Sequence, residues 1–379
     1  MTSVRFGVVG YGNIGRTHVD TLLSDAVPEG TVAAVVSRSP VELPAGVRRF
    51  DTTQELLASN LADAVVVATP TMTHTEIGAR ILAADCHLVM EKPLAMSLKQ
   101  ARHLTAAVPH GRFAAVMLNQ RYHPVYREIK NLVTRGVLGR IVRFNWLMTS
   151  WYRPDVYFHV SSWRGTWPGE GGGALLNQCI HNLDVLQWIL GMPETVFADV
   201  RFGKYHDIEV EDEASALLAY EDGTTGVVVT STGEAPGINR LDIVGDRGTL
   251  SYDESGLHLS VSDVSVAQHC ATTHDMFGMP DFSTRRVNVQ AEVNQHACVF
   301  NDVVDAILRD RAPATPLAEG LASIELANAI LYSAWQGRRI SLPLDAEAYE
   351  SALEQRLENA SLRKPKDVEV NIDMDASYR

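Results

Sequence analysis

A lysine at the end of an apolar run is the residue of this chain best placed to do chemistry. Lys92 lies in Glu91-Lys92-Pro93, which directly follows the run at 86–90 that predicts a buried strand. A partly desolvated lysine at a strand end has a lowered pKa or holds a substrate hydroxyl by hydrogen bonding. Lys92 is therefore a candidate catalytic residue, and an ordinary exposed lysine is the alternative.

A second group of polar residues lies far downstream, after a glycine-rich stretch at 169–173. Asn177, His181 and Asp184 are spaced i, i+4 and i+7, so they share one face of the helix predicted over 174–190. Histidine is the commonest general acid or base, and the amide and carboxylate beside it suit proton transfer. These three are also candidate catalytic residues. The alternative is a polar cluster that only satisfies hydrogen bonds in a core.

The spacing Gly10-x-Gly12-x-x-Gly15 follows a predicted strand at 4–9 and opens a helical pattern. In this motif the first glycine makes a tight turn, the second lets backbone approach a pyrophosphate, and the third packs the helix against the strand. The free N–H groups of the first helical turn suit phosphates. The motif predicts dinucleotide binding, and a glycine-rich turn without a ligand is the alternative. The expected contacts are Gly10, Gly12, Asn13, Ile14 and Gly15.

The end of the second predicted strand, about twenty residues beyond the glycines, decides between NAD and NADP. An acidic residue at that position usually binds the ribose hydroxyls of NAD. This chain has Ser37-Arg38-Ser39 instead, and a hydroxyl with a guanidinium suits a 2′-phosphate. We therefore expect Ser37 and Arg38 to bind NADP. NAD is the alternative if Arg38 is a solvated charge or stacks on the adenine.

The segment at 144–167 holds four of the six tryptophans, together with tyrosines and arginines. Aromatic faces stack on sugar rings, and arginine forks hydrogen-bond their hydroxyls. This composition predicts a carbohydrate-like small-molecule substrate, and an aromatic core or an oligomer interface is the alternative. Whether the arginines meet a phosphate or carboxylate of the substrate is left open. The candidate substrate residues are Tyr152, Arg153, Trp163 and Arg164.

Two α/β domains are expected to position these residues. Residues 1–121 alternate apolar runs with helical patterns, which predicts a Rossmann domain with a doubly wound parallel sheet. Residues 122–345 combine helices with alternating strands and tight turns from 196 to 264. They predict a substrate-binding and oligomerisation domain of the α+β class with an open, mostly antiparallel sheet. Residues 346–379 are charged with little apolar periodicity and are expected to form a C-terminal tail.

Composition restricts the partners and the cellular location. The chain of 379 residues has a net charge of −13, which argues against nucleic-acid and anionic-membrane partners because both attract basic surfaces. No apolar stretch is long enough to span a bilayer, and the first residues lack the pattern of a signal peptide. The four cysteines form no CxxC pair, so we expect reduced thiols, no metal site and a cytoplasmic protein.

The order of the motifs resembles the glucose–fructose oxidoreductase/inositol dehydrogenase (Gfo/Idh/MocA) family, from residue 4 to about residue 345. The resemblance rests on the glycine motif, on Thr69-Pro70 followed by His74, and on Glu91-Lys92-Pro93. It continues through Gly171-Gly172-Gly173-Ala174-Leu175-Leu176-Asn177 with His181-x-x-Asp184, and ends at Ile340-Ser341-Leu342-Pro343. Beyond the glycine motif, the resemblance implies cofactor contacts at Thr69, Pro70, His74, Glu91, Lys92 and Asn119.

The resemblance also implies a mechanism. Lys92 would hydrogen-bond the reacting hydroxyl or carbonyl, and His181 would move its proton while nicotinamide takes or gives hydride. A cis Lys92–Pro93 bond and a homodimer or homotetramer built through sheet faces are implied as well. Asn177 departs from the pattern, because many relatives have an aspartate there and an amide accepts no proton. The change leaves His181 less basic, unless Asp184 takes the place of the missing aspartate.

The expected function is that of an NAD(P)-dependent dehydrogenase or reductase acting on a secondary hydroxyl or carbonyl of a sugar, cyclitol or sugar derivative. Two alternatives remain. One is a redox-neutral glycoside hydrolase that uses its nicotinamide only transiently, and the other is a non-catalytic NAD(P)-sensing regulator. Lys92 and His181 argue against the regulator, because a sensor has no need of both.

Overall fold

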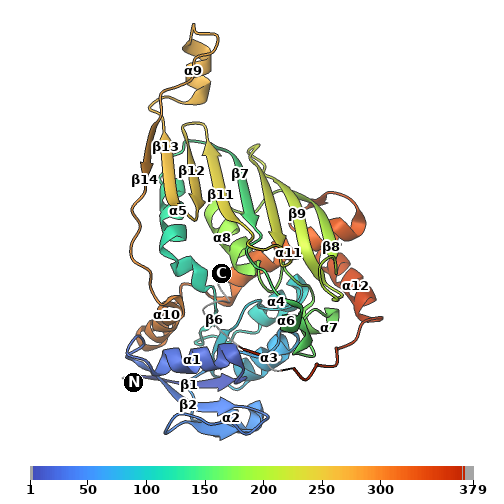
Figure 1. Cartoon of the computed structure of the whole chain (residues 1–379). Coiled ribbons are helices and arrows are strands. Elements are labelled where there is room, and N and C mark those ends of the chain that lie inside the picture. Colours follow the sequence, from blue (N-terminus) through green and yellow to red (C-terminus); the bar gives the residue numbers. More distant parts are fainter. Residues whose placement is uncertain (1–2, 369, 372–379) are drawn as a thin grey trace.

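A computed structural model describes residues 3–368, 370 and 371, and places a six-stranded sheet at the N-terminal end of the chain (Figure 1). All pairings in this sheet are parallel, in the order β3-β2-β1-β4-β5-β6. This confirms the predicted Rossmann sheet. Its strands are β1 (Val4–Val9), β2 (Gly30–Val36), β3 (Arg48–Phe50), β4 (Ala64–Val67), β5 (His87–Met90) and β6 (Ala114–Val116). Its helices are α1 (Asn13–Leu23), α2 (Thr53–Ala58), α3 (His74–Ala83) and α4 (Leu98–Ala106).

The central strands of this sheet are apolar because helices cover both of its faces. Every residue of β4 is buried, and so is every residue of β5 after His87. Parallel strands present their carboxyl ends at one edge, where open α/β sheets bind ligands. The glycine turn, Thr69 and Lys92 follow β1, β4 and β5 respectively, so they meet at that edge.

The second sheet has nine strands in the order β14-β13-β12-β11-β7-β10-β9-β8-β15. Only β7 and β10 pair in parallel, so the sheet is mixed and mostly antiparallel, as predicted. Its strands are β7 (Ile141–Met148), β8 (Thr195–Phe202), β9 (Glu211–Ala219), β10 (Thr225–Ser231), β11 (Asn239–Gly245), β12 (Gly248–Asp253), β13 (Gly256–Val261), β14 (Ser283–Arg286) and β15 (Ile340–Ser341).

Helices α5, α8 and α11 lie on one side of this sheet, and α9 projects from its far end (Figure 1). Helix α10 instead packs on the Rossmann domain, where Phe300 meets Phe6 with ring centroids 5.7 Å apart. The division between domains at residue 121 stays a prediction. Helix α10 belongs to the second domain by sequence but packs on the first. The remaining helices are α5 (Pro124–Thr134), α6 (Asp155–His159), α7 (Trp167–Glu170), α8 (Ile180–Leu190), α9 (Val266–Thr272), α10 (Gln295–Arg309), α11 (Gly320–Gln336) and α12 (Ala346–Leu357), with short 3₁₀ turns η1 (Thr71–Thr73), η2 (Asn119–Tyr122) and η3 (Leu317–Glu319).

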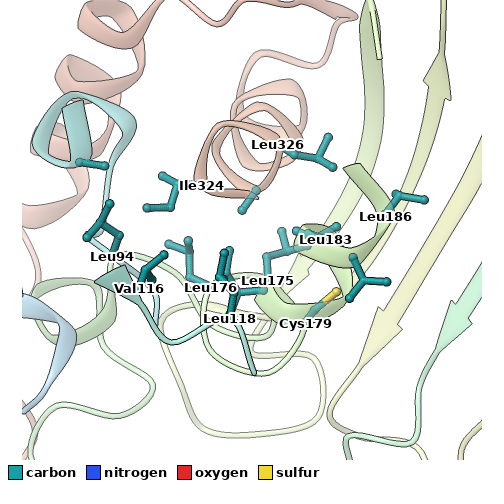
Figure 2. Close-up of a cluster of buried hydrophobic side chains, with 14 of the residues drawn as sticks. Leu94, Val116, Leu118, Leu175, Leu176, Cys179, Leu183, Leu186, Ile324 and Leu326 are labelled. Atoms are coloured by element: carbon teal, nitrogen blue, oxygen red, sulfur yellow. The ribbon is translucent and has the colours of Figure 1, made fainter. Parts of the chain in front are cut away.

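One apolar core connects the two sheets (Figure 2). Leu94 and Val116 come from the Rossmann side, Leu175 and Leu176 from the segment before α8, and Ile324 from α11; all are essentially inaccessible to solvent. Burying one such side chain stabilises a fold by ~1.5–3 kcal/mol. This packing holds the segment that leads to Asn177 against the strand ends of the Rossmann sheet.

Two sequence-based expectations about this region and the C-terminus are wrong. The helix predicted over 174–190 begins only at Ile180, because the residues before it are tied to β9. A Cβ on Gly173 would lie 2.1 Å from the carbonyl oxygen of Glu211, and the same carbonyl accepts a hydrogen bond from the Ala174 N–H at 2.9 Å. Asn177 therefore lies in a turn and not on the helical face of His181.

The second correction concerns the expected tail. Its first part is α12, capped by the Asp345 side chain, which accepts from the Ala348 N–H at 3.0 Å. Tyr349 and Leu353, four residues apart, are buried among α4, α7 and α11. The chain then follows the segment after α6, where the Arg363 N–H donates to the Ser162 carbonyl at 2.8 Å. Residues 369 and 372–379 of the predicted tail lie outside the described part of the chain.

Candidate active site

The glycine turn after β1 has the shape that a dinucleotide requires. Gly10 has φ +94°, and a Cβ there would lie 2.5 Å from the Ala68 carbonyl oxygen. A Cβ on Gly15 would lie 2.0 Å from the Gly10 carbonyl oxygen, whereas one on Gly12 would meet nothing within 4 Å. Packing therefore requires glycine at positions 10 and 15, whereas Gly12 leaves open space for a pyrophosphate. No side chain caps α1, so its first N–H groups face that space.

Ser37 and Arg38 follow β2 at the same edge of the sheet. The Ser37 hydroxyl donates to the Ser39 carbonyl at 2.9 Å, and Arg38 is exposed. Asp51 is the acidic residue at the end of the neighbouring β3, where it binds Arg49. A hydroxyl and an exposed guanidinium thus lie where the adenosine end of a cofactor is expected.

Glu91 binds the Rossmann helix instead of facing the cofactor space. Its Oε1 is 2.6 Å from His18 Nε2 on α1, and its Oε2 accepts the Lys92 N–H at 3.0 Å. Burial raises the pKa of the Glu91 carboxyl. The His18 hydrogen bond and the Lys92 charge outweigh burial, and hold the pKa at about 2. The Glu91 carboxylate is thus an ionised anchor beneath Lys92, and the cofactor contact expected of Glu91 stays a prediction.

His74 joins two turns of the sheet edge. Its Nδ1 is 2.8 Å from the Pro93 carbonyl oxygen and its Nε2 is 2.8 Å from the Thr69 carbonyl oxygen. Burial lowers the pKa of the His74 imidazole, and the hydrogen bonds to the two carbonyl oxygens oppose that effect. Both ring nitrogens face backbone carbonyls, and the expected cofactor contact of His74 stays a prediction. Thr69 lies against the glycine turn, 2.9 Å from the Cβ position of Gly10, and Pro70 follows it as the N-cap of η1.

Lys92 reaches from the end of β5 to the second domain. The Lys92–Pro93 bond is cis, as the resemblance implies. The Nζ atom donates to the Asn177 carbonyl oxygen at 2.9 Å, so residues 85 positions apart in the chain meet. Burial lowers the pKa of Lys92, and the Glu91 carboxylate opposes that effect. The structure thus brings together two of the segments that the sequence analysis selected independently.

His181 lies close to the Lys92 charge on the first turn of α8. It is 8% exposed, and its Nδ1 is buried without a hydrogen-bond partner among the described residues. Burial lowers the pKa of the His181 imidazole well below its usual range, and the Lys92 charge lowers it further. A neutral imidazole with an unsatisfied nitrogen is ready to exchange a proton with a ligand.

Asp184 is bound elsewhere and does not take the place of a carboxylate at position 177. Its two oxygens accept from Arg121 of η2 at 2.8 and 2.6 Å, and Gln187 donates to one of them. Glu319 binds the same guanidinium at 2.6 Å. This buried network fixes α8 against η2, so the expected catalytic role of Asp184 is corrected to a positioning role.

Asn119 follows β6 at the start of η2 and is 5% exposed. Its Oδ1 is buried without a hydrogen-bond partner in the part of the chain that the structure describes. Its Nδ2 lies 3.5 Å from Nε2 of His296 on α10. An orphaned amide oxygen at the ligand-binding edge fits the expected cofactor contact.

The predicted substrate residues divide into two groups. Arg153 and Arg164 lie over the ring of Tyr157, at 5.4 and 4.4 Å from its centroid, and both charges act on Lys92. Trp163 is half-buried and stacks with Arg164 at 4.8 Å. Tyr152 is 46% exposed, and its carbonyl accepts from Arg153. The two arginines are thus near Lys92, Trp163 contacts one of them, and Tyr152 lies on the surface.

Glu170 is a residue of the site that the sequence analysis missed. It is 3% exposed, and its carboxylate accepts hydrogen bonds from the Asn177 side-chain amide and from the Gly165 N–H, the latter at 2.6 Å. Burial raises the pKa of the Glu170 carboxyl to about 7. A glutamate among four glycines was the available indication, because an acidic residue there has no helical face to join.

Within residues 3–368, 370 and 371, no helix is both long and apolar enough to cross a bilayer. The same residues contain no group of three or more His, Cys, Asp or Glu side chains arranged to hold a metal ion.

A parallel sheet with a glycine cradle, joined at its ligand edge to a lysine–histidine pair, defines a nicotinamide-dependent oxidoreductase. Residues 4–116 match the oxidoreductase family with an NAD-binding Rossmann fold, and residues 126–251 match the Gfo/Idh/MocA C-terminal domain. The chain belongs to the Gfo/Idh/MocA family and is an NAD-binding oxidoreductase.

The chain is similar to inositol 2-dehydrogenase of Rhizobium meliloti, with 24% identity over 90% of this chain and 99% of that protein. It is 26% identical to the rhizopine catabolism protein MocA of the same species, over 62% of this chain and 74% of that protein. Among solved structures, it resembles the WlbA dehydrogenase of Bordetella pertussis in complex with NADH and UDP-GlcNAcA. That likeness has 27% identity and a TM-score of 0.76, over 90% of this chain and 100% of that one.

Proposed function

We propose that the protein transfers hydride between nicotinamide C4 and a carbon that bears a secondary hydroxyl or carbonyl, in a sugar, cyclitol or sugar derivative. The observation that carries this proposal is the meeting of Lys92 with Asn177 beside His181, at the edge that also carries the glycine cradle. Sugar and inositol dehydrogenases among the relatives support the substrate class.

The cofactor, when bound, supplies the hydride chemistry, and the protein's own residues handle the oxygen and its proton. The Lys92 ammonium donates to the reacting oxygen and stabilises negative charge on it. The neutral His181 imidazole accepts the hydroxyl proton during oxidation and returns it during reduction. Glu91, with its low pKa, keeps a negative charge beneath Lys92 and opposes the effect of burial on it.

The first prediction tests Lys92. Replacing Lys92 with alanine removes the donor to the reacting oxygen, and we expect turnover to fall at least about a hundredfold. The assay follows nicotinamide absorbance with NAD(H) and NADP(H) against neutral polyols, inositols and keto-sugars, and against uronic acids and sugar phosphates. Near-normal turnover of the variant removes Lys92 from the mechanism. Cofactor binding without turnover on the whole panel, but with release of a sugar from an added glycoside, favours the redox-neutral hydrolase.

The second prediction concerns the cofactor, for which we propose a preference for NADP. The hydroxyl and guanidinium after β2 support this choice. Arg38→Ala removes a charged donor to the 2′-phosphate, a loss of ~1.5–3 kcal/mol, so NADPH binding should weaken about tenfold to a hundredfold. NADH binding should stay unchanged. Titration of nicotinamide fluorescence measures both, and tighter binding of NADH by the natural protein contradicts the proposal.

We also propose a cytoplasmic homodimer or homotetramer. The outward face of the second sheet supports self-association, because Phe197 of β8 and Leu217 of β9 are direct cross-strand neighbours with 41% and 49% exposure. Val227 of β10 lies opposite Leu217 and continues the apolar strip.

A further inference from the structure

The carboxylate of Glu170 binds the side chain of Asn177, the residue whose backbone carbonyl accepts a hydrogen bond from Lys92. The Asn177 amide nitrogen donates to Glu170 Oε1, and the carbonyl oxygen of the same asparagine accepts from Lys92 Nζ at 2.9 Å. The Tyr157 hydroxyl lies 3.4 Å from the same amide nitrogen. Asn177 thus bridges the two residues: its side chain binds the Glu170 carboxylate, and its backbone carbonyl binds the Lys92 ammonium.

The position of Glu170 is determined by close backbone packing. Its Oε2 accepts the Gly165 N–H, and Gly171 ends α7 in the left-handed region with φ +70°. A Cβ on Gly171 would lie 2.4 Å from Cβ of Met96, and one on Gly169 would lie 2.1 Å from the Trp163 carbonyl oxygen. The carboxylate therefore has little freedom to turn away from Asn177.

The charges that face Glu170 come from several elements. Lys92 at the end of β5 and Arg164 before α7 favour its ionised form, while Glu211 of β9 is a second buried acid nearby. In return, the Glu170 charge raises the pKa of Lys92, in the same direction as Glu91 and against Arg153 and Arg164. Glu91 is ionised throughout the useful pH range, so of the two acids that raise the pKa of Lys92, Glu170 is the one whose charge changes near neutrality.

We infer that Glu170 is a positioning residue for Lys92: its carboxylate orients Asn177, and its negative charge keeps the Lys92 ammonium protonated. The inference rests on the proposed function only for the role of Lys92 at the reacting oxygen. Burial raises the pKa of Glu170 to about 7. The carboxylate near Lys92 is therefore fully charged only above that pH.

The test measures the pKa of Lys92 directly in the full-length protein. Competitive acetylation with acetic anhydride across a pH series, read by peptide mass spectrometry, reports the fraction of neutral Lys92 without any turnover. Glu170→Gln keeps the size and one of the two accepted hydrogen bonds but removes the charge, so the pKa of Lys92 should fall by about one unit. Glu170→Asp keeps the charge and should restore most of that shift.

Glu211→Gln is the matched control, because Glu211 is equally buried with a pKa of about 7, but its carboxylate accepts from the Leu175 N–H and exerts no resolved effect on Lys92. It should leave the labelling curve of Lys92 in place. The double variant Glu170→Gln with Asn177→Asp moves the carboxylate from position 170 to position 177, whose backbone carbonyl binds Lys92. It should recover the labelling curve of the natural protein.

An unchanged curve in Glu170→Gln overturns the inference. If that variant does not fold, Glu170→Ala takes its place: loss of the same charge should lower the pKa of Lys92, and an unaltered value overturns the inference. The pH profile of kcat/KM on the substrate panel is read separately. A labelling shift without turnover by the natural protein refutes the proposed function and leaves the role of Glu170 standing. Turnover by the natural protein, with no labelling shift in Glu170→Gln, supports the proposed function and refutes the role of Glu170.

Discussion

The residues around Lys92 explain how an asparagine serves where an aspartate is expected. Asn177 offers no charge, but its side chain is bound to Glu170 and its carbonyl to Lys92. The negative charge near the lysine is thus divided between Glu91, which stays ionised, and Glu170, which titrates near neutrality. Asp184, the substitute suggested by spacing, is instead occupied by Arg121.

At the scale of single residues, the low pKa of Glu91 predicts a pH-dependent stability. Its folded pKa of about 2 lies below the ordinary value of 4.5, so its contribution is fully present above pH 4.5 and is lost as the pH falls towards 2. Glu91→Gln should lower the free energy of unfolding at pH 7 by up to ~3 kcal/mol, and the deficit should shrink in acid. Urea unfolding at several pH values measures it.

Glu76→Gln is the control for that measurement, because Glu76 is an exposed helical partner of Arg80. Its effect should stay below ~0.5 kcal/mol at every pH. A Glu91→Gln deficit that is the same at pH 7 and pH 3 contradicts the assigned ionisation.

At the scale of elements, different glycines of the turn between β1 and α1 serve cofactor binding and folding. The backbone approaches at Gly10 and Gly15 are internal to the turn, whereas the space beside Gly12 belongs to a ligand. The same logic applies to β5, whose following turn is joined through His74 to the turn after β4. Two neighbouring strand ends are therefore held in one arrangement before any ligand binds.

Alanine substitutions in the glycine turn should have opposite effects. Gly12→Ala should leave the melting temperature of the free protein unchanged but weaken NAD(P)H binding about tenfold or more, because its Cβ fills the ligand's space. Gly15→Ala should destabilise the free protein by ~1–3 kcal/mol, because its Cβ meets the Gly10 carbonyl. Calorimetry and fluorescence titration measure the two effects. Equal melting temperatures for both variants contradict this division.

At the scale of the whole molecule, the two domains share their cores. Helix α10 returns to pack on β1 and α1, and the core of Figure 2 joins α11 and the segment before α8 to the Rossmann strand ends. The second sheet is covered on one side by helices, and its outward face carries the strip of Phe197, Leu217 and Val227 (Figure 1).

Disrupting that strip should dissociate the proposed oligomer. Leu217→Asp places a charge at the centre of the strip, and burying an unpartnered carboxylate in an interface costs several kcal/mol. We expect the variant to elute as a monomer in size-exclusion chromatography with light scattering. Leu23→Asp, at an exposed leucine ending α1, is the control and should keep the natural assembly. A natural protein that is monomeric at all concentrations refutes the proposed assembly.

The local pattern of the sequence determined the Rossmann sheet, the glycine turn and the mostly antiparallel second sheet, because apolar periodicity and glycine spacing act over short stretches of chain. It also selected Lys92 and His181 as candidates for catalysis. Tertiary structure decided what each polar group binds: Glu91 to His18, His74 to two carbonyls, Asp184 to Arg121, and Glu170 to Asn177. It also decided where α8 begins and that α12 is a packed helix. Those outcomes depend on contacts between distant segments, and a buried polar group binds whichever partner the completed fold brings within reach.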